Sequence, residues 1–195
     1  MGVTAIYGGT FNPFHIGHYG VLSTLCEQNF IDKVLLLPDR LPPHKEYDYK
    51  IPDSHRIKMC EIVCEDFKKA ELSLIDFSRK GKSYTVDTIK ILRKKYPDEK
   101  FIFVCGGDMI VTLDRWYNWQ ELIKLTEFLT IKRADQSDEE FNFNVERIRN
   151  LGAKITIIEK DVTDVSSSKL RKGIKKELLP KKVYNYIKEK GLYNG

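Results

Sequence analysis

The chain has 195 residues, 42% of them hydrophobic and 31% charged, a composition typical of one sizeable globular domain. Its 33 basic and 28 acidic side chains give a net charge of +5, a modest excess that suits polyphosphate substrates without requiring nucleic acid. No apolar run reaches the length of a membrane span and no secretory signal pattern precedes the first strand pattern, so we expect a cytoplasmic protein.

Strand-like and helix-like patterns alternate along the chain. Short apolar runs typical of buried strands occupy 3–7, 33–38, 72–77, 101–105, 128–131 and 155–158. Helical periodicity is found around 21–26, 52–67, 83–96, 109–125 (with a break near Trp116), 138–151, from 169, and over 180–191. The alternation predicts an α/β fold with a Rossmann-like, doubly wound, mainly parallel sheet. We expect one domain over 1–195, with a small helical C-terminal part over 166–195.

The helix expected over 52–67 has an apolar spacing that predicts a buried stripe of Ile57, Cys60, either Val63 or Cys64, and Phe67. Cys60 and Cys64 lie one turn apart on this helix and would suit two metal ligands. No further Cys or His pair with ligand spacing completes such a site, so we favour core packing for both thiols.

The stretch from Gly8 to His18 is the most distinctive in the chain. It reads Gly-Gly-Thr-Phe-Asn-Pro-Phe-His-Ile-Gly-His and joins a strand pattern to a helical segment. Two glycines at a strand end let the backbone turn and approach a ligand without a Cβ in the way. His15 and His18 flank the helix entrance, where backbone N–H groups and the helix dipole favour anions. The stretch therefore predicts a phosphate site with imidazole donors, unlike the Walker and dinucleotide-binding glycine loops.

Other unusual segments also follow predicted strands. They are Pro42 to Lys45, Gly106 to Asp108 and Ser166 to Arg171. Since the ligands of open parallel sheets bind at the carboxyl ends of the strands, these segments and the opening stretch predict one shared site.

The opening stretch resembles the H-x-G-H signature of the nucleotidyltransferase superfamily, and in full it is most similar to bacterial nicotinate-nucleotide adenylyltransferases. The similarity covers nearly the whole chain. It includes P-x-H-K at 42–45, S-Y-T-x-D-T at 83–88, G-x-D and two tryptophans within 106–119, and the serine run with its arginine at 166–171. The resemblance implies the HUP-type fold and adenylyl transfer from ATP to nicotinate mononucleotide, with release of pyrophosphate, in NAD biosynthesis.

The resemblance also implies which residues handle the phosphates. His15, His18, Lys45 and Arg171 would hold the phosphate groups and stabilise the charge that develops during transfer. ATP would further contact the glycine turn and two later segments, namely Gly8, Gly9, Thr10, Phe11, Gly106, Asp108, Ser166, Ser167 and Ser168. Mg²⁺ would be bound through the ATP phosphates, so we expect no metal ligands of the protein's own.

Nicotinate mononucleotide would be bound by Thr85, Trp116, Tyr117 and Asn12. Trp116 would stack on the cationic pyridinium ring. The backbone N–H groups of Thr85 and Tyr117 would bind the ring carboxylate, and a neutral carboxamide would gain less from these donors. Trp119 is expected to pack inward. Asp114 and Arg115 carry charges near this pocket, and the sequence does not say whether they touch substrate.

Two other functions fit parts of the pattern. Another transferase of the superfamily, acting on nicotinamide mononucleotide or phosphopantetheine, would keep the phosphate residues without requiring Thr85 and Trp116. A nucleotide sensor without catalysis would not require both histidines together with Lys45 and Arg171. The partners expected are therefore ATP and nicotinate mononucleotide, with no nucleic acid and no membrane, while the sequence leaves a homo-oligomer open.

Overall fold

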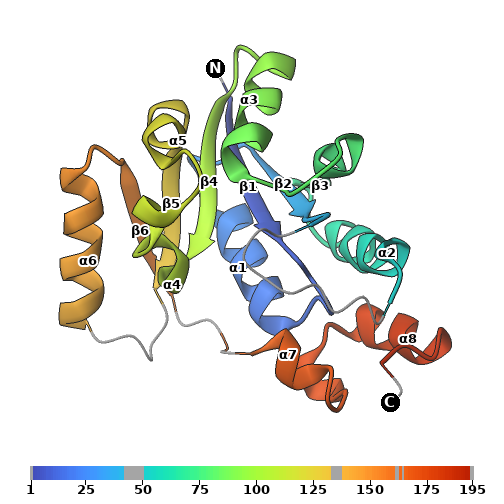
Figure 1. Cartoon of the computed structure of the whole chain (residues 1–195). Coiled ribbons are helices and arrows are strands. Elements are labelled where there is room, and N and C mark those ends of the chain that lie inside the picture. Colours follow the sequence, from blue (N-terminus) through green and yellow to red (C-terminus); the bar gives the residue numbers. More distant parts are fainter. Residues whose placement is uncertain (1, 42–50, 133–137, 161–162, 164, 194–195) are drawn as a thin grey trace.

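The structure is a computed structural model that describes residues 2–41, 51–132, 138–160, 163 and 165–193. Its strands are β1 (Val3–Gly9), β2 (Lys33–Pro38), β3 (Ala70–Leu72), β4 (Lys100–Gly106), β5 (Glu127–Lys132) and β6 (Ile155–Glu159). They form one sheet in the order β3-β2-β1-β4-β5-β6, and each neighbouring pair is parallel (Figure 1). This order is that of Rossmann-like doubly wound folds, so the predicted fold class is confirmed.

Helices cover both faces of the sheet (Figure 1). One core contains side chains of α1 (Ile16–Glu27), α2 (Asp53–Cys64) and α8 (Lys181–Glu189), and the other those of α3 (Thr85–Lys95), α5 (Trp119–Leu125) and α6 (Asp138–Asn150). Successive strand residues alternate between the two cores, as Ala5 and Tyr7 do with Ile6. Burial on both faces explains why the strands are continuous apolar runs in the sequence.

Short helical turns complete the described chain: η1 (Ile75–Ser78), α4 (Gly107–Ile110), η2 (Leu113–Arg115), α7 (Ser167–Leu170) and η3 (Lys176–Leu178). The break expected near Trp116 is confirmed, because this residue is extended between η2 and α5. The described residues from Ser166 onward form helical turns and no strand, as expected of the C-terminal part. No helix in the described ranges is long and apolar enough to cross a lipid bilayer.

The strand predicted over 72–77 is largely wrong. β3 ends at Leu72, and the following residues turn into η1. Leu74 leaves the β region, with φ −99° and ψ 26°. Asp76, only 3% exposed, then points inward and accepts hydrogen bonds from Arg79 and Thr88. At the edge of the sheet a strand is paired on one side only, and this polar network displaces further pairing.

The buried stripe of α2 also differs from the prediction. Cys60 and Val63 are buried, but Ile57 is half-buried and the helix ends at Cys64, before Phe67. The helix instead buries the whole side chain of Arg56, with 0% exposure. Apolar spacing does not predict this, because the reason for burial is a set of hydrogen bonds to the site described below.

Candidate active site

The strand order reverses between β1 and β4, and a cavity of about 400 Å³ opens there. Such switch points are where doubly wound sheets bind their ligands. The cavity is lined by the glycine end of β1 with Thr10, the end of β4, the start of α3 and the segment before α5, including Gly8, Gly9, Thr10, Ser83, Tyr84, Thr85, Gly106, Trp116 and Tyr117. Gly8, Gly9, Thr10 and Gly106, predicted to contact ATP, therefore share one cavity with Thr85, Trp116 and Tyr117, predicted to bind the acceptor. The predicted phosphate residues His15, His18 and Arg171 are not among the residues that line it.

The glycine turn is shaped by an aromatic side chain. Phe11 has φ +48°, a left-handed conformation that a bulky residue rarely adopts, and its ring is 1% exposed. The ring packs on Tyr7 and Phe14, with centroids 5.5 Å and 5.1 Å away. A Cβ on Gly9 would lie 2.9 Å from this ring, so a glycine is required there. Phe11, predicted to contact ATP, thus has a buried ring and is not among the residues that line the cavity.

The two histidines cap α1 reciprocally. The His18 backbone N–H donates to His15 Nδ1 at 3.2 Å, and the His15 backbone N–H donates to His18 Nδ1 at 3.4 Å. The rings are stacked, with centroids 3.6 Å apart. Since each Nδ1 accepts a hydrogen bond, the neutral rings carry their proton on Nε2. The cap thus fixes both imidazoles at the start of α1, and their role as donors to a phosphate stays a prediction.

Gly17 holds this cap against the chain beyond β6. A Cβ at this position would lie 2.7 Å from the Thr163 carbonyl oxygen and 3.1 Å from His15 Nδ1. We expect Gly17→Ala to displace the His15 ring, lower kcat at least ten-fold and destabilise the fold by about 1–3 kcal/mol. Steady-state kinetics and urea unfolding would measure both. Gly173→Ala is the matched control, because a Cβ there meets nothing within 4 Å; equal effects of the two variants would contradict the prediction.

The C-terminal part holds the opening loop from the other side. Arg171 Nη1 donates to the Asn12 carbonyl at 2.8 Å, and Ser167 Oγ donates to the Pro13 carbonyl at 3.2 Å. Tyr193 donates its hydroxyl hydrogen to Asn12 Oδ1 at 2.5 Å. Asn12, predicted to bind the acceptor, is 5% exposed and is not among the residues that line the cavity. The structure thus places Asn12 beside Arg171, and not with Thr85 and Trp116.

Two further segments predicted to contact ATP are short helical turns. Ser166 caps α7 by accepting the Lys169 N–H at 3.5 Å, and Ser168 Oγ accepts from Arg171 Nη2 at 3.2 Å. The helix begins at Ser167, two residues before the predicted start. Asp108, on α4, is exposed, and its Oδ1 lies 2.6 Å from the place a Gly106 Cβ would occupy. Lys45 lies outside the described residues.

Aromatic side chains line the part of the cavity that is predicted to bind the acceptor. Trp116 contacts Phe103 edge to face, with centroids 5.9 Å apart, and Tyr117 packs on Tyr84 at 4.4 Å. Trp119 is half-buried, so its expected inward packing is only partial. Asp114, to which the sequence assigned no role, pairs with Arg147 of α6 at 2.5 Å, and the Arg147 guanidinium lowers the pKa of the Asp114 carboxyl.

Arg56 is one residue near the site that the sequence pattern did not indicate. Its guanidinium donates to the Thr10 carbonyl at 2.6 Å, the Asp39 carbonyl at 2.8 Å and Asp53 Oδ1 at 2.6 Å. It therefore joins the ends of β1 and β2 to the first turn of α2. The pairing of Arg56 with a carboxylate three residues earlier was visible in the sequence, but its burial was not.

Neither a reactive thiol nor a metal-binding group is found among the residues that the structure describes. Burial raises the pKa of the Cys64 thiol to about 12 and holds that of Cys60 well above its ordinary value. Burial, with a smaller contribution from the Asp108 carboxylate, likewise raises the pKa of Cys105, which lines the cavity. All three remain neutral thiols near neutral pH. Within the described ranges, no group of three His, Cys, Asp or Glu side chains is placed to hold a metal ion.

The class of protein defined by this fold and site is cytidylyltransferase-like, and a family model of that description matches residues 6–173. The nicotinate-nucleotide adenylyltransferase of Bacillus subtilis (strain 168) is 33% identical over an alignment of 195 positions, and the alignment covers 96% of each chain. The chain therefore belongs to the nicotinate-nucleotide adenylyltransferase family.

Solved structures agree with this assignment at the level of the fold. A Plasmodium falciparum nicotinic acid mononucleotide adenylyltransferase complexed with NaAD superposes with a TM-score of 0.81 at 23% identity, covering 100% of this chain and 98% of that one. The same protein complexed with APC gives a TM-score of 0.79 at 23% identity with the same coverage. The fold predicted from the opening stretch is thus found over the whole chain.

Proposed function

We propose that this protein transfers the adenylyl group of ATP to nicotinate mononucleotide, forming nicotinate adenine dinucleotide and pyrophosphate, as a step of NAD biosynthesis in the cytoplasm. The observation that carries the proposal is the single cavity at the switch point. In it, the glycine turn that leads into the histidine-capped helix lies with Thr85, Trp116 and Tyr117. Membership of the family, whose relatives bear this activity in their names, supports the same reaction.

The reaction is a direct displacement at the α-phosphorus of ATP. An oxygen of the acceptor phosphate forms a bond to the α-phosphorus, while the bond to the bridging oxygen of the β-phosphate breaks and pyrophosphate leaves. The acceptor supplies the nucleophile, so the protein has to position both substrates and stabilise charge on the phosphoryl oxygens. His15 and His18 would donate their Nε2–H groups to those oxygens, with His18 closest to the transferred group.

The leaving pyrophosphate needs cationic donors. We assign Arg171 this role, because its hydrogen bond to the Asn12 carbonyl fixes a guanidinium beside the opening loop. Lys45 is assigned the same role on its sequence context alone. Mg²⁺ would arrive as part of the ATP substrate, held by the phosphates and by water.

The acceptor half of the cavity is proposed to select the substrate. Thr85 begins α3 and lines the cavity, so its N–H lies at a helix N-terminus where a carboxylate is favoured. Trp116, held edge to face by Phe103, offers its ring to the pyridinium. Together these groups favour nicotinate mononucleotide over the neutral nicotinamide analogue.

Trp116→Ala is expected to raise the KM for nicotinate mononucleotide about ten-fold, because the stacking surface and its cation–π attraction are lost. The KM for ATP should change little, and Trp116→Phe should retain most of the affinity. Initial rates at varied concentrations of each substrate separate the two constants. Trp119→Ala serves as the control, since Trp119 does not line the cavity. A larger change in the KM for ATP than for the mononucleotide would contradict the assignment.

The proposed function is tested by pyrophosphate release in a coupled assay. ATP and Mg²⁺ are supplied with nicotinate mononucleotide, nicotinamide mononucleotide or phosphopantetheine as acceptor. We expect the highest kcat/KM with nicotinate mononucleotide. Comparable values for the first two acceptors would overturn the selectivity, and preference for phosphopantetheine would overturn the acceptor. Binding of ATP without turnover of any acceptor would identify a nucleotide sensor instead.

A further inference from the structure

A buried carboxylate lies in the wall of the cavity that is proposed to receive a carboxylate. Asp76 of η1 is 3% exposed and lines this cavity together with Ser83, Tyr84, Thr85 and Thr88. A negative charge at this position would repel an anionic substituent of the pyridine ring, because charges that share a small and poorly hydrated cavity are weakly screened. The wall must therefore contain a compensating charge.

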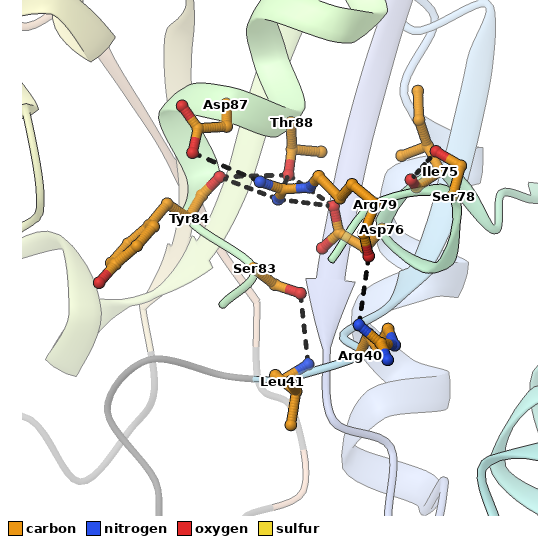
Figure 2. A network of polar contacts seen from close by, with 10 residues as sticks. All are labelled: Arg40, Leu41, Ile75, Asp76, Ser78, Arg79, Ser83, Tyr84, Asp87 and Thr88. Carbon is orange, nitrogen blue, oxygen red and sulfur yellow. Dashed lines mark hydrogen bonds and ion pairs between the residues drawn. The ribbon is translucent and has the colours of Figure 1, made fainter. Parts of the chain in front are cut away.

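Arg79 supplies that charge from a position outside the cavity lining. Its Nη2 lies 3.0 Å from Asp76 Oδ1, and the Thr88 hydroxyl lies 2.7 Å from each of these atoms (Figure 2). The Arg79 side chain is 17% exposed and is not among the residues that line the cavity. Arg79 thus neutralises Asp76 without occupying the space of a ligand.

The same guanidinium also holds the first turn of α3. Arg79 Nη2 donates to the Tyr84 carbonyl at 3.2 Å, and Nη1 lies 3.4 Å from Asp87 Oδ2 (Figure 2). Tyr84 is the N-cap of α3 and directly precedes Thr85. The donor proposed to bind the ring carboxylate is therefore positioned by the arginine that neutralises the opposing charge.

We propose that Arg79 is a positioning and specificity-determining residue, which allows a cavity walled by Asp76 to accept a mononucleotide with an anionic ring substituent. The inference rests on the proposed function and adds to it a residue outside the cavity lining. It also gives a reason for the two polar residues that end segment 83–88, since Asp87 and Thr88 both contact Arg79.

The test is a double-mutant cycle on substrate preference, defined as the ratio of kcat/KM for nicotinate mononucleotide to that for nicotinamide mononucleotide. Arg79→Gln removes the guanidinium that pairs with the Asp76 carboxylate, so we expect this ratio to fall at least ten-fold, with little change in the KM for ATP. Asp76→Asn should keep or raise the ratio. The double variant Arg79→Gln/Asp76→Asn should recover most of the loss, because both charges are removed.

Recovery of the ratio in the double variant would show that the loss comes from the Asp76 charge. Damage to the fold would not be reversed, since replacing Asp76 as well cannot restore lost packing contacts. Arg79→Lys keeps the charge and should retain more of the preference than Arg79→Gln. Arg93→Gln is the matched control, because Arg93 of α3 likewise donates to a backbone carbonyl, that of Leu125 at 2.9 Å, and Leu125 is not part of the cavity wall. Midpoints of thermal unfolding are recorded for every variant.

An active wild type whose preference is unchanged in Arg79→Gln would overturn this inference alone. A preference that falls equally in the single and double variants would overturn it as well, since the Asp76 charge would then play no part. If the wild type released no pyrophosphate with either pyridine mononucleotide, the proposed function would fail, and this inference with it.

Discussion

Replacement of His18 by alanine should lower kcat by about a hundred- to a thousand-fold, the effect of losing one preorganised donor at a developing charge. The reciprocal cap with His15 fixes the ring so that Nε2–H is directed away from its own helix backbone. Such a donor needs no reorganisation when charge builds up on the α-phosphate. The KM values should change much less than kcat, because the interaction is strongest in the transition state.

The fold should persist in this variant. His18 accepts one long hydrogen bond in the cap, at 3.4 Å, and its ring stacks on that of His15, so its loss should cost about 1–2 kcal/mol. His55→Ala is the matched control, because the His55 ring also forms one hydrogen bond, with the Tyr186 hydroxyl at 2.7 Å, but it does so between α2 and α8. Single-turnover rates measured at saturating ATP would give the chemical step directly. A chemical step within three-fold of the wild type would remove His18 from the mechanism.

The parts of the fold that could be predicted are those with a local signal. Apolar runs gave five of the six strands in nearly their observed positions, and the glycine turn identified the end of β1. The exception was at the edge of the sheet, where Leu74 and Ile75 looked like strand residues. Their course is set by Asp76, whose partners Arg79 and Thr88 belong to later turns of the chain. Hydrogen bonds between polar side chains three and twelve residues apart leave no hydrophobic periodicity in the sequence.

The same limit applies to the candidate site. Residues with unusual local chemistry, such as His15, His18 and Trp116, were singled out from the sequence. Arg56, which is buried, and Arg79, which is half-buried, were not, because a charged side chain on a helix or loop is ordinarily assigned to solvent. Both are held by carbonyl and carboxylate oxygens: those of Arg56 follow β1 and β2 and begin α2, and those of Arg79 lie on η1 and at the start of α3. These arginines hold segments of the candidate site in place, although neither is proposed to touch substrate.

Arg56→Met should therefore have a large effect on stability and activity together. Methionine keeps a long, unbranched apolar stem of similar volume but removes the donors to the Thr10 and Asp39 carbonyls and to Asp53. Buried carbonyls without donors are costly, whereas Asp53 is 31% exposed and can be rehydrated. We expect the free energy of unfolding to fall by about 2–4 kcal/mol, measured by urea denaturation.

Activity should fall for a separate reason, because Arg56 joins the glycine turn after β1 to the segment after β2. When that connection is lost, Thr10 can move away from the cavity it lines, and kcat/KM for ATP should decrease at least ten-fold even at temperatures where the variant is folded. Arg149→Met is a close control, since Arg149 also pairs with a carboxylate three residues earlier and donates to a strand carbonyl, that of Ile155 at 2.7 Å. Arg149 is 36% exposed and does not line the cavity, so its loss should reduce stability slightly and leave the KM for ATP unchanged. If the two variants lost activity only in proportion to their unfolded fractions, Arg56 would be a stabilising residue without a role in positioning the turn.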